Sequence, residues 1–343
     1  MILDTNTAIA IIVLICMGIP ITVAIVQGVK NHRQGKLPAA NGKPAQTPPL
    51  TATPDTFGVN GRYDVKLQPH KQGGMATVWL ATERNTGKTC IIKTPRRGTT
   101  MDNVYLEKLM LEAAFLKRLN HPNIVKYVED FYYNGEFHLV LEHVTGETMM
   151  SSSPRTPHEE FTVINWACQV LDALSYIHAA GIIHRDINPK NIMLCSDGSV
   201  KLIDFGTAKN LNEIKKDTVS RDPFTQIANS GFDIPELFTG GNSDQRSDLC
   251  GVAQTCIYLL TLKHPNDVCS NLIKSNWPRS FTEAAAVADY LVAAGISRRT
   301  AKCLAQAVMF SSSSRFADAR TMLAALLSVT GSPMRPVEAA VPG

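Results

Sequence analysis

The hydrophobic pattern of the chain changes near Glu160, and this change constrains the fold more than any other feature of the sequence. From 63 to 140, short runs rich in β-branched and aromatic residues are broken by Asn-Thr-Gly and Asn-Gly turns, a pattern typical of antiparallel strands. The strands are predicted at 76–82, 89–94, 123–130 and 136–142. After Glu160, apolar residues recur mostly at helical spacing.

One helix is predicted inside the strand-rich part, at 103–119, and it ends at Asn120 because Pro122 disfavours helix in the residue before it. The later helices are predicted at 161–180, 248–262, 281–294, 299–310 and 317–328, with a small β patch between 182 and 204. The expected fold class is therefore α+β, with a small antiparallel β lobe that contains one helix and a large, mainly helical lobe.

Composition supports a globular protein and narrows its partners. Of the 343 residues, 44% are hydrophobic and 19% charged, which provides for a sizeable core and argues against a disordered or collagen-like chain. The formal net charge of +4 is too small to indicate a nucleic-acid partner, and none is predicted. The eight cysteines include no Cys-x-x-Cys pair, so we interpret them as reduced residues in a reducing compartment.

The stretch 8–29 predicts a membrane anchor. It carries no formal charge, and at about 1.5 Å rise per residue it spans roughly 33 Å, close to the thickness of about 30 Å of a bilayer core. Only Asp4 precedes it, whereas Lys30, Arg33 and Lys36 follow it, so the positive-inside rule places the N-terminus outside and the rest in the cytoplasm. A cleaved signal peptide and a buried helix are the alternatives; the first lacks a basic leader and a small-residue cleavage site, the second a polar face.

These patterns divide the chain into four parts. Residues 1–33 form the transmembrane anchor with its basic flank, and 34–56 form a linker rich in proline that cannot bury enough apolar surface to fold. Residues 57–329 form the folded domain, and 330–343 form an unstructured tail. We therefore expect a single-pass protein of the cell membrane, anchored in the lipid bilayer through 8–29.

Two carboxylates and an amide stand in a fixed order in the segments 182–194 and 201–209: Asp186, Asn191 and Asp204. Oxygen ligands of this kind bind Mg²⁺, and a carboxylate can orient a hydroxyl group and accept its proton. Both functions are needed for phosphoryl transfer from a nucleotide. The alternative is that these residues belong to turns of a surface loop.

From about 62 to 326 the sequence resembles the eukaryotic-type, or Hanks-type, protein kinases, in particular the bacterial serine/threonine kinases. The resemblance rests on His-Arg-Asp followed by Asn191, and on Asp-Phe-Gly beginning at Asp204. It implies a bilobal protein-kinase fold for 57–329, with Asp186 as the catalytic base and Asn191 and Asp204 as Mg²⁺ ligands. It also implies ATP and Mg²⁺ as cofactors and a protein as substrate.

The resemblance extends to the nucleotide-binding elements. The run 71–81 stands where such kinases carry a glycine-rich loop, and Gly73, Gly74 and Ala76 are small enough to form a flap over phosphates. Lys93 corresponds to the lysine that binds the α- and β-phosphates, and Glu112 to the glutamate that pairs with it. Glu107 is a rival partner on the same helix, but the spacing to His121-Pro122 favours Glu112.

The run 139–147 resembles the hinge between the lobes. Backbone groups of Glu142 and Val144 are expected to bind adenine, next to Leu141 as the gatekeeper.

Val78 and Met193 are expected to lie on either side of the adenine ring. Ile91 departs from the pattern, because the family usually has alanine over the ring; a bulkier roof is expected to lower nucleotide affinity or tilt the ring, although overpacking usually costs only about 1 to 3 kcal/mol.

The second half of the domain matches in its architecture. Glu236, with Ile234 two residues before it, is expected to pair with Arg315, and Asp248 to hold the backbone of the catalytic loop. Kinases of small molecules usually lack these features, so their presence favours a protein substrate.

The match fails at two positions that meet near the transferred phosphate in the family. Asn188 stands where serine/threonine kinases have lysine, and Asn229 where they have threonine. The loss of a cation there costs on the order of 2 to 4 kcal/mol of transition-state stabilisation. The change is compatible with slow turnover and with a different substrate geometry. We still predict that Asn188 is one of the catalytic residues.

Arg185 suggests regulation, since an arginine at this position in the family pairs with a phosphorylated activation loop. We hypothesise autophosphorylation at Thr218, Ser220 or Thr225, in a transient homodimer; the alternative is that these are ordinary loop hydroxyls.

The sequence therefore predicts a membrane-anchored serine/threonine kinase that autophosphorylates and takes part in signalling. The alternative is a membrane-tethered pseudokinase or a weakly active nucleotide-binding scaffold. It is favoured by Ile91, by Asn188 and by Lys71, which stands where the family has the first glycine of its glycine-rich loop.

Overall fold

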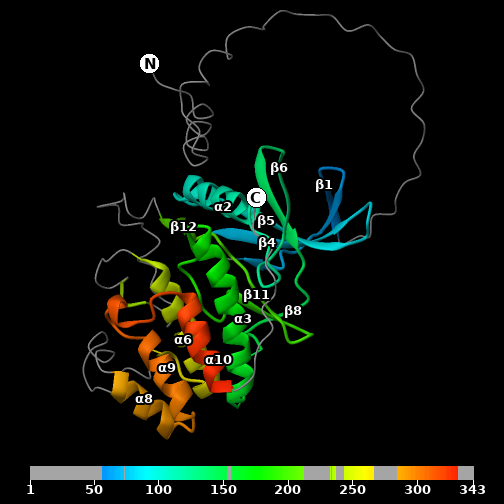
Figure 1. Ribbon diagram of the computed structural model, residues 1–343. Coiled ribbons are helices and arrows are strands. Elements are labelled where there is room, and N and C mark those ends of the chain that lie inside the picture. Colours follow the sequence, from blue (N-terminus) through cyan, green and yellow to red (C-terminus); the bar gives the residue numbers. More distant parts are fainter. Residues whose placement is uncertain are drawn as a thin grey trace, which may run out of the picture. The chain divides into compact units, whose positions relative to one another are not determined.

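The computed structural model of the chain describes residues 56–72, 74–152, 156–211, 232, 234–236, 243–265 and 284–330 (Figure 1). The predicted anchor 8–29, nearly all of the linker 34–56 and the tail beyond 330 lie outside these ranges, so those parts of the domain division stay predictions. Among the residues that the structure describes, no helix combines the length and the apolar composition that a membrane span needs.

An antiparallel sheet and one helix form the first lobe. The strands are β1 (Thr56–Val59), β2 (Tyr63–Lys66), β3 (Lys71–Gln72), β4 (Ala76–Glu83), β5 (Thr89–Pro95), β6 (Tyr127–Tyr133) and β7 (Glu136–Glu142), and the helix is α2 (Asp102–Leu116). The sheet order is β1-β2-β4-β5-β7-β6, with β3 paired to β4. Helix α2 packs against β5, β6 and β7.

Side-chain alternation along β5 determines which residues face the site. Ile92 is buried in a small cluster on one face of the sheet, together with Val65 and Val140. Ile91 packs against the main core on the other face. Because successive residues of a strand point to opposite faces, Lys93 lies on the same face as Ile91.

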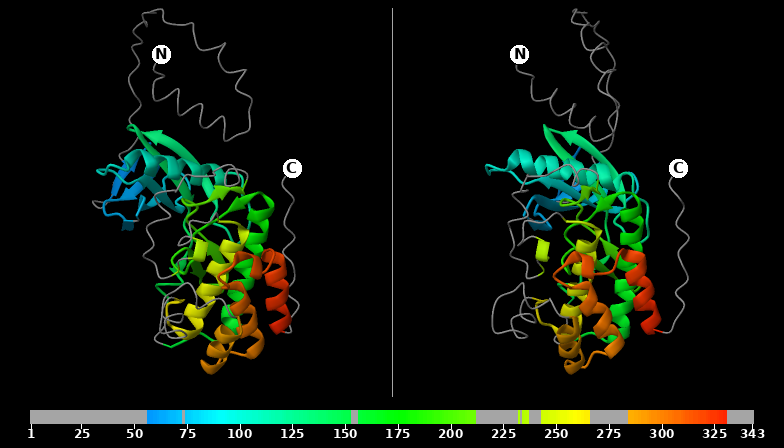
Figure 2. Two further views of the ribbon diagram at one scale, coloured as in Figure 1. Left: turned by 90° about the vertical axis from the view of Figure 1, so that its left-hand side faces the viewer. Right: turned by 60° about the vertical axis from the view of Figure 1, so that its left-hand side comes forward.

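Helices form most of the second lobe. Those within the described residues are α3 (Glu160–Ala179), α6 (Gln245–Thr261), α8 (Ala284–Ala293), α9 (Arg298–Ala307), the 3₁₀ turn η4 (Ser312–Ser314) and α10 (Ala319–Thr330). Two small sheets complete the lobe, formed by β8 (Gly146–Thr148), β10 (Ile192–Cys195) and β11 (Val200–Leu202), and by β9 (Ile182–Ile183) and β12 (Lys209–Asn210). Figure 2 shows α8 and α9, drawn in orange, at the end of the domain opposite the sheet lobe.

Helix α6 supports the loop between β9 and β10. Its N-cap Asp244 and Ser247 form a capping box, each side chain bonded to the other's backbone. Gly251 lets the helix approach that loop, because an added Cβ would lie 2.5 Å from the carbonyl oxygen of Ile187. A small residue is therefore required where α6 packs against the loop that carries Asp186.

The two-lobe α+β arrangement is confirmed, and one predicted strand is wrong in part. The segment expected to form a strand at 123–130 enters β6 only at Tyr127. Its first residues join the lobes instead: Ile124 forms a parallel bridge with Leu202, and Val125 N donates to Leu202 O at 2.9 Å. This residue pattern is that of a buried strand, but its hydrogen bonds go to β11 of the second lobe.

Candidate active site

Lys93 joins two carboxylates from separate elements. On β5, its ammonium lies 2.7 Å from Glu112 Oε1 of α2 and 3.3 Å from Asp204 Oδ1, which follows β11. Glu112 Oε1 also accepts from the backbone N of Phe205 at 3.2 Å. Glu112 is 2% exposed, whereas the rival Glu107 points to solvent. The predicted ion pair of Lys93 with Glu112 is confirmed.

The three charges shift one another's protonation. Burial alone would lower the pKa of Lys93, but the carboxylates of Asp204 and Glu112 outweigh burial and hold that pKa above its ordinary value. In turn, the Lys93 ammonium holds the pKa of Asp204 below its ordinary value. Asp204 is therefore an anion at neutral pH, and its side chain is 43% exposed.

Two amide groups hold the carboxylate of Asp186. Asn188 Nδ2 donates to Asp186 Oδ1 at 2.6 Å, and Asn191 Nδ2 donates to Asp186 Oδ2 at 2.7 Å. Burial, followed by the nearby charge of Asp204, raises the pKa of Asp186 above its ordinary value, against the effect of these two amides. The orientation of the carboxylate is thus fixed while each oxygen keeps a lone pair for a further donor.

Asp248 fixes the backbone just before Asp186, as predicted. From α6, its Oδ2 accepts from His184 N at 2.9 Å and its Oδ1 from Arg185 N at 2.7 Å. His178 of α3 lies 2.8 Å from the same carboxylate. Arg185 has a φ of 69°, a conformation that ordinary residues rarely adopt, so these contacts hold a strained backbone in place.

A cleft of about 270 Å³ lies between the sheet lobe and the helical lobe. The residues predicted to bind the nucleotide or the metal that line it are Gly74, Ala76, Val78, Ile91, Lys93, Glu142, Val144, Met193, Asn191 and Asp204. Leu141 and Glu112 line it as well. Asp186 and Asn188 are not among the lining residues and reach the cleft through Asn191, whose amide bonds to Asp186. Gly73 lies outside the described residues.

The apolar half of the cleft is arranged as a slot. Val78 on β4 belongs to the sheet lobe and Met193 on β10 to the helical lobe, as expected for the two sides of a flat ring. Ile91 faces the same space and is paired with Leu141 across β5 and β7. Gly146 has no room for a side chain, since an added Cβ would lie 2.1 Å from Leu194 O.

The side-chain oxygens of Asn191 and Asp204 are suitable ligands for a divalent cation. Asn191 donates its amide hydrogens to Asp186, so its Oδ1 remains an acceptor, and Asp204 contributes a carboxylate. A cation of the Mg²⁺ kind commonly takes one or two protein oxygens and completes its shell with water and phosphate oxygens. In the part of the chain that the structure describes, no cluster of three or more His, Cys, Asp or Glu residues competes for a metal.

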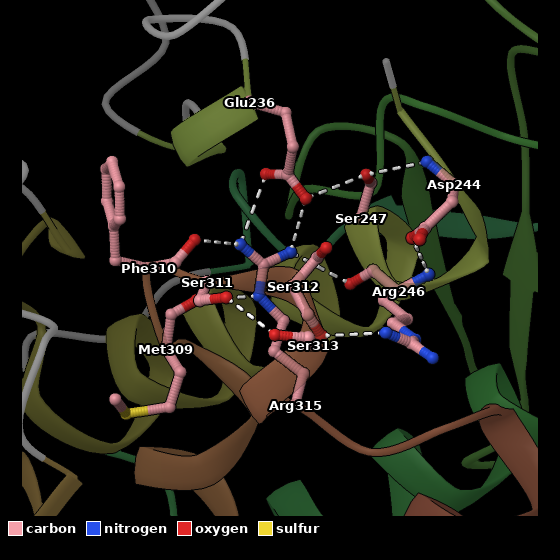
Figure 3. A network of polar contacts seen from close by, with 10 residues as sticks. All are labelled: Glu236, Asp244, Arg246, Ser247, Met309, Phe310, Ser311, Ser312, Ser313 and Arg315. Atoms are coloured by element: carbon pink, nitrogen blue, oxygen red, sulfur yellow. Dashed lines mark hydrogen bonds and ion pairs between the residues drawn. The ribbon is translucent and has the colours of Figure 1, made fainter. Parts of the chain in front are cut away.

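A second buried ion pair lies away from the cleft (Figure 3). Arg315 donates to both carboxylate oxygens of Glu236, at 2.6 and 3.1 Å. Its remaining donors bond to the backbone oxygens of Met309, Arg246 and Phe310, at 2.7, 3.2 and 3.3 Å. The predicted pair is confirmed, and it is a closed network that ties the segment containing Glu236 to the end of the helical lobe.

Several residues of the site were not predicted, and three of them have contacts or a charge that bear on it. His178 pairs with Asp248, Met75 lies in the cleft with its methyl group 3.5 Å from the Cβ position of Gly206, and Lys190 lines the cleft from the loop that carries Asp186. The sequence offers a signal only for Lys190, a cation between two predicted site residues. The predicted regulatory and recognition positions Asn229, Thr218, Ser220 and Thr225 lie outside the described residues.

The fold and the cleft together define a protein-kinase architecture. A solved structure, the kinase domain of PknI from Mycobacterium tuberculosis, superimposes with a TM-score of 0.59 at 21% identity, over 81% of this chain and 99% of that chain. The sequence matches the family described as protein kinase domain over residues 71–314. The chain therefore belongs to the protein kinase family.

Bacterial kinases are among its relatives. A probable serine/threonine-protein kinase of Streptomyces coelicolor, SCO3848, is 34% identical over 60% of this chain. The probable kinase PknB of Bifidobacterium longum is 32% identical over 63%, and PrkC of Bacillus subtilis 29% identical over 61%. The matches cover 31%, 32% and 32% of these relatives, so the chain spans about a third of their length.

Proposed function

We propose that the chain is an ATP-dependent protein serine/threonine kinase. One observation carries the proposal: a lysine held by two carboxylates, an oriented third carboxylate and an apolar slot adjoin one cleft. The relatives named as serine/threonine kinases support this activity and do not favour a scaffold without turnover.

Each residue has a role that its contacts permit. The slot between Val78 and Met193 takes adenine, and Lys93 positions the phosphates. Asp186 orients the acceptor hydroxyl and accepts its proton. Asn191 and Asp204 hold Mg²⁺, which when bound neutralises charge on the phosphate oxygens.

The test is phosphoryl transfer by the full chain, purified in detergent, from radiolabelled ATP to a generic protein in the presence of Mg²⁺. The matched variant is Asp186→Ala, which leaves the cleft lining intact. We expect label on the substrate and on the chain itself with the wild type, and loss of both with the variant. Equal labelling by the two proteins, or labelling by neither, would refute the proposal.

We further propose that residues 8–29 anchor the chain in the cell membrane with the kinase domain in the cytoplasm. The support is the uncharged stretch and the basic residues that follow it. The chain should stay with membranes after alkaline extraction, and deletion of 8–29 should release it. Degradation of the kinase domain by protease added outside intact spheroplasts would contradict this orientation.

Autophosphorylation between two copies is the proposed regulatory reaction. Mixing wild type with a tagged Asp186→Ala chain tests it, because label on the tagged chain can come only from its neighbour. The triple change of Thr218, Ser220 and Thr225 to alanine should lower activity; unchanged activity would show that these hydroxyls are not regulatory.

A further inference from the structure

The phosphate end of the cleft has few unpaired positive charges. Lys93 is the cation at its centre, yet Glu112 and Asp204 already lie 2.7 and 3.3 Å from its ammonium. Asp186 adds another carboxylate next to Asn191. The described residues around Lys93 therefore carry more negative than positive charge, while the triphosphate of ATP is itself a polyanion.

Asn188 does not provide the missing charge. It is an uncharged residue, 5% exposed, and its amide donates to the side chain and the backbone oxygen of Asp186, at 2.6 and 3.2 Å. Its Oδ1 accepts from Lys190 N at 2.9 Å. Both polar atoms of the amide are thus used within the loop, and one of them fixes the backbone at Lys190.

Lys190 is placed to act on the nucleotide. It is exposed, it lines the cleft beside the metal-ligand candidate Asn191, and its ammonium has no hydrogen bond or ion pair with any described residue. Lys108 also lines the cleft, but it already takes part in an interaction of its own. An ammonium on a fixed backbone at the edge of a phosphate-binding cleft is a point charge suited to phosphate oxygens.

We propose that Lys190 binds the phosphate groups of the nucleotide and supplies the positive charge that position 188 lacks. This inference rests on the proposed function, because it assumes that the cleft takes ATP. It predicts that Lys190 contributes to the affinity for ADP and ATP and contributes nothing to the affinity for adenosine. A role in selecting acidic protein substrates would leave all three affinities unchanged.

The experiment is titration calorimetry of the full chain in detergent with ATP, ADP and adenosine, each with Mg²⁺. Lys190→Met should weaken ATP and ADP binding roughly 10-fold, as expected for one exposed charge on a phosphate, and leave adenosine binding unchanged. Lys190→Arg should keep most of the affinity, and the loss in Lys190→Met should shrink at high salt. Lys302→Met is the matched control, because Lys302 is exposed on α9 and outside the cleft lining.

Unchanged ATP affinity in Lys190→Met would overturn the proposal, and so would an equal loss for adenosine. A rise in KM for an acidic peptide with unchanged ATP affinity would overturn it as well and assign Lys190 to substrate selection. Nucleotide binding that depends on Lys190 in a chain that labels no protein would refute the proposed kinase activity and leave this inference standing. A wild-type chain that binds neither ATP nor ADP would refute both.

Discussion

Two buried ion pairs among the described residues, one in the cleft and one in the helical lobe, are built differently. Arg315 and Glu236 meet through two parallel hydrogen bonds, and backbone oxygens take every other donor of the guanidinium. Lys93 meets Glu112 through one short contact and shares its ammonium with Asp204, whose side chain is 43% exposed.

The difference separates a contact that holds the fold from one that prepares chemistry. The Arg315 guanidinium has no donor left for a ligand, because each of its N–H groups already bonds to an acceptor in the network. The Lys93 group has surplus negative charge that faces the cleft, so a cation and the phosphates that it carries can complete it. The two pairs are buried to a similar extent. They differ because every donor of Arg315 is hydrogen-bonded within the protein, whereas the Lys93 group can still bind a ligand.

The largest expected effect on stability comes from breaking the closed network. Arg315→Met leaves Glu236 as a buried carboxylate without its cation, and we expect the free energy of unfolding to fall by about 3 to 5 kcal/mol. Urea denaturation measures this change. Arg298→Met is the matched control, because the Arg298 pair with Asp289 is exposed on both sides and should contribute less than about 1 kcal/mol. Equal losses in the two variants would contradict the contrast.

Lys93→Met should have the opposite pattern, with a large loss of activity and a small loss of stability. We expect kcat/KM to fall roughly 100- to 1,000-fold, because the cation that positions the phosphates is lost. The unfolding free energy should fall by less than about 2 kcal/mol, since Asp204 can be hydrated and Glu112 can take up a proton. Kinetic assays and urea denaturation of the same preparation test both statements. Unfolding as severe as in Arg315→Met would show that Lys93 holds the fold as well.

Asp248 combines the two kinds of role, since it is buried and holds the catalytic loop. Burial alone would raise the pKa of Asp248, but the hydrogen bond from His178 and neighbouring charges outweigh burial and hold it below its ordinary value. A depressed carboxyl pKa stabilises the fold above the unfolded value of about 4, and this contribution is lost as pH falls through the folded value.

Asp248→Asn should therefore cost about 2 to 3 kcal/mol at neutral pH, because an amide cannot accept from both backbone donors. The gap in unfolding free energy between wild type and variant should narrow below about pH 4. Denaturation curves at several pH values measure it, with Asp289→Asn on the surface as the control. A gap that stays constant with pH would show that the charge of Asp248 contributes nothing.

Most of the fold was predictable from the sequence, because local periodicity determines where strands and helices form. The predicted helix at 103–119 and strand at 136–142 are observed as Asp102–Leu116 and Glu136–Glu142. The strand at 123–130 was wrong in its first half, since its pattern shows that the residues are buried and gives no sign that their partner is Leu202. Pairing across the chain is a tertiary property that a local pattern does not contain.

The sequence motifs identified the individual residues of the site. They did not predict which atoms of those residues contact one another. The pairing of Lys93 with Glu112 followed from the resemblance to protein kinases, and spacing only favoured Glu112 over Glu107. That His178 joins Asp248, or that Met75 enters the cleft, depends on how helices and loops pack, which spacing does not reveal.

The smallest expected effect concerns a single hydrogen bond in the cleft, the one from Asn188 to Asp186. The sequence suggests a residue that lacks a charge near the phosphate, whereas the structure shows a donor to Asp186 Oδ1 at 2.6 Å. Asn188→Ala should lower kcat about 10-fold, the effect of one hydrogen bond to a charged group. Because the lost amide favours the ionised carboxylate, the acid limb of the kcat profile should move to higher pH.

The companion change is Asn188→Lys, which keeps a donor near Asp186 and should retain activity. A rate above that of the wild type would show that the missing charge limits the chemistry. Asn103→Ala, at an exposed position of α2, is the control for loss of an amide elsewhere. If Asn188→Ala kept the wild-type kcat and pH profile, the amide of Asn191 would be enough to orient the Asp186 carboxylate, and the hydrogen bond from Asn188 would not contribute to catalysis.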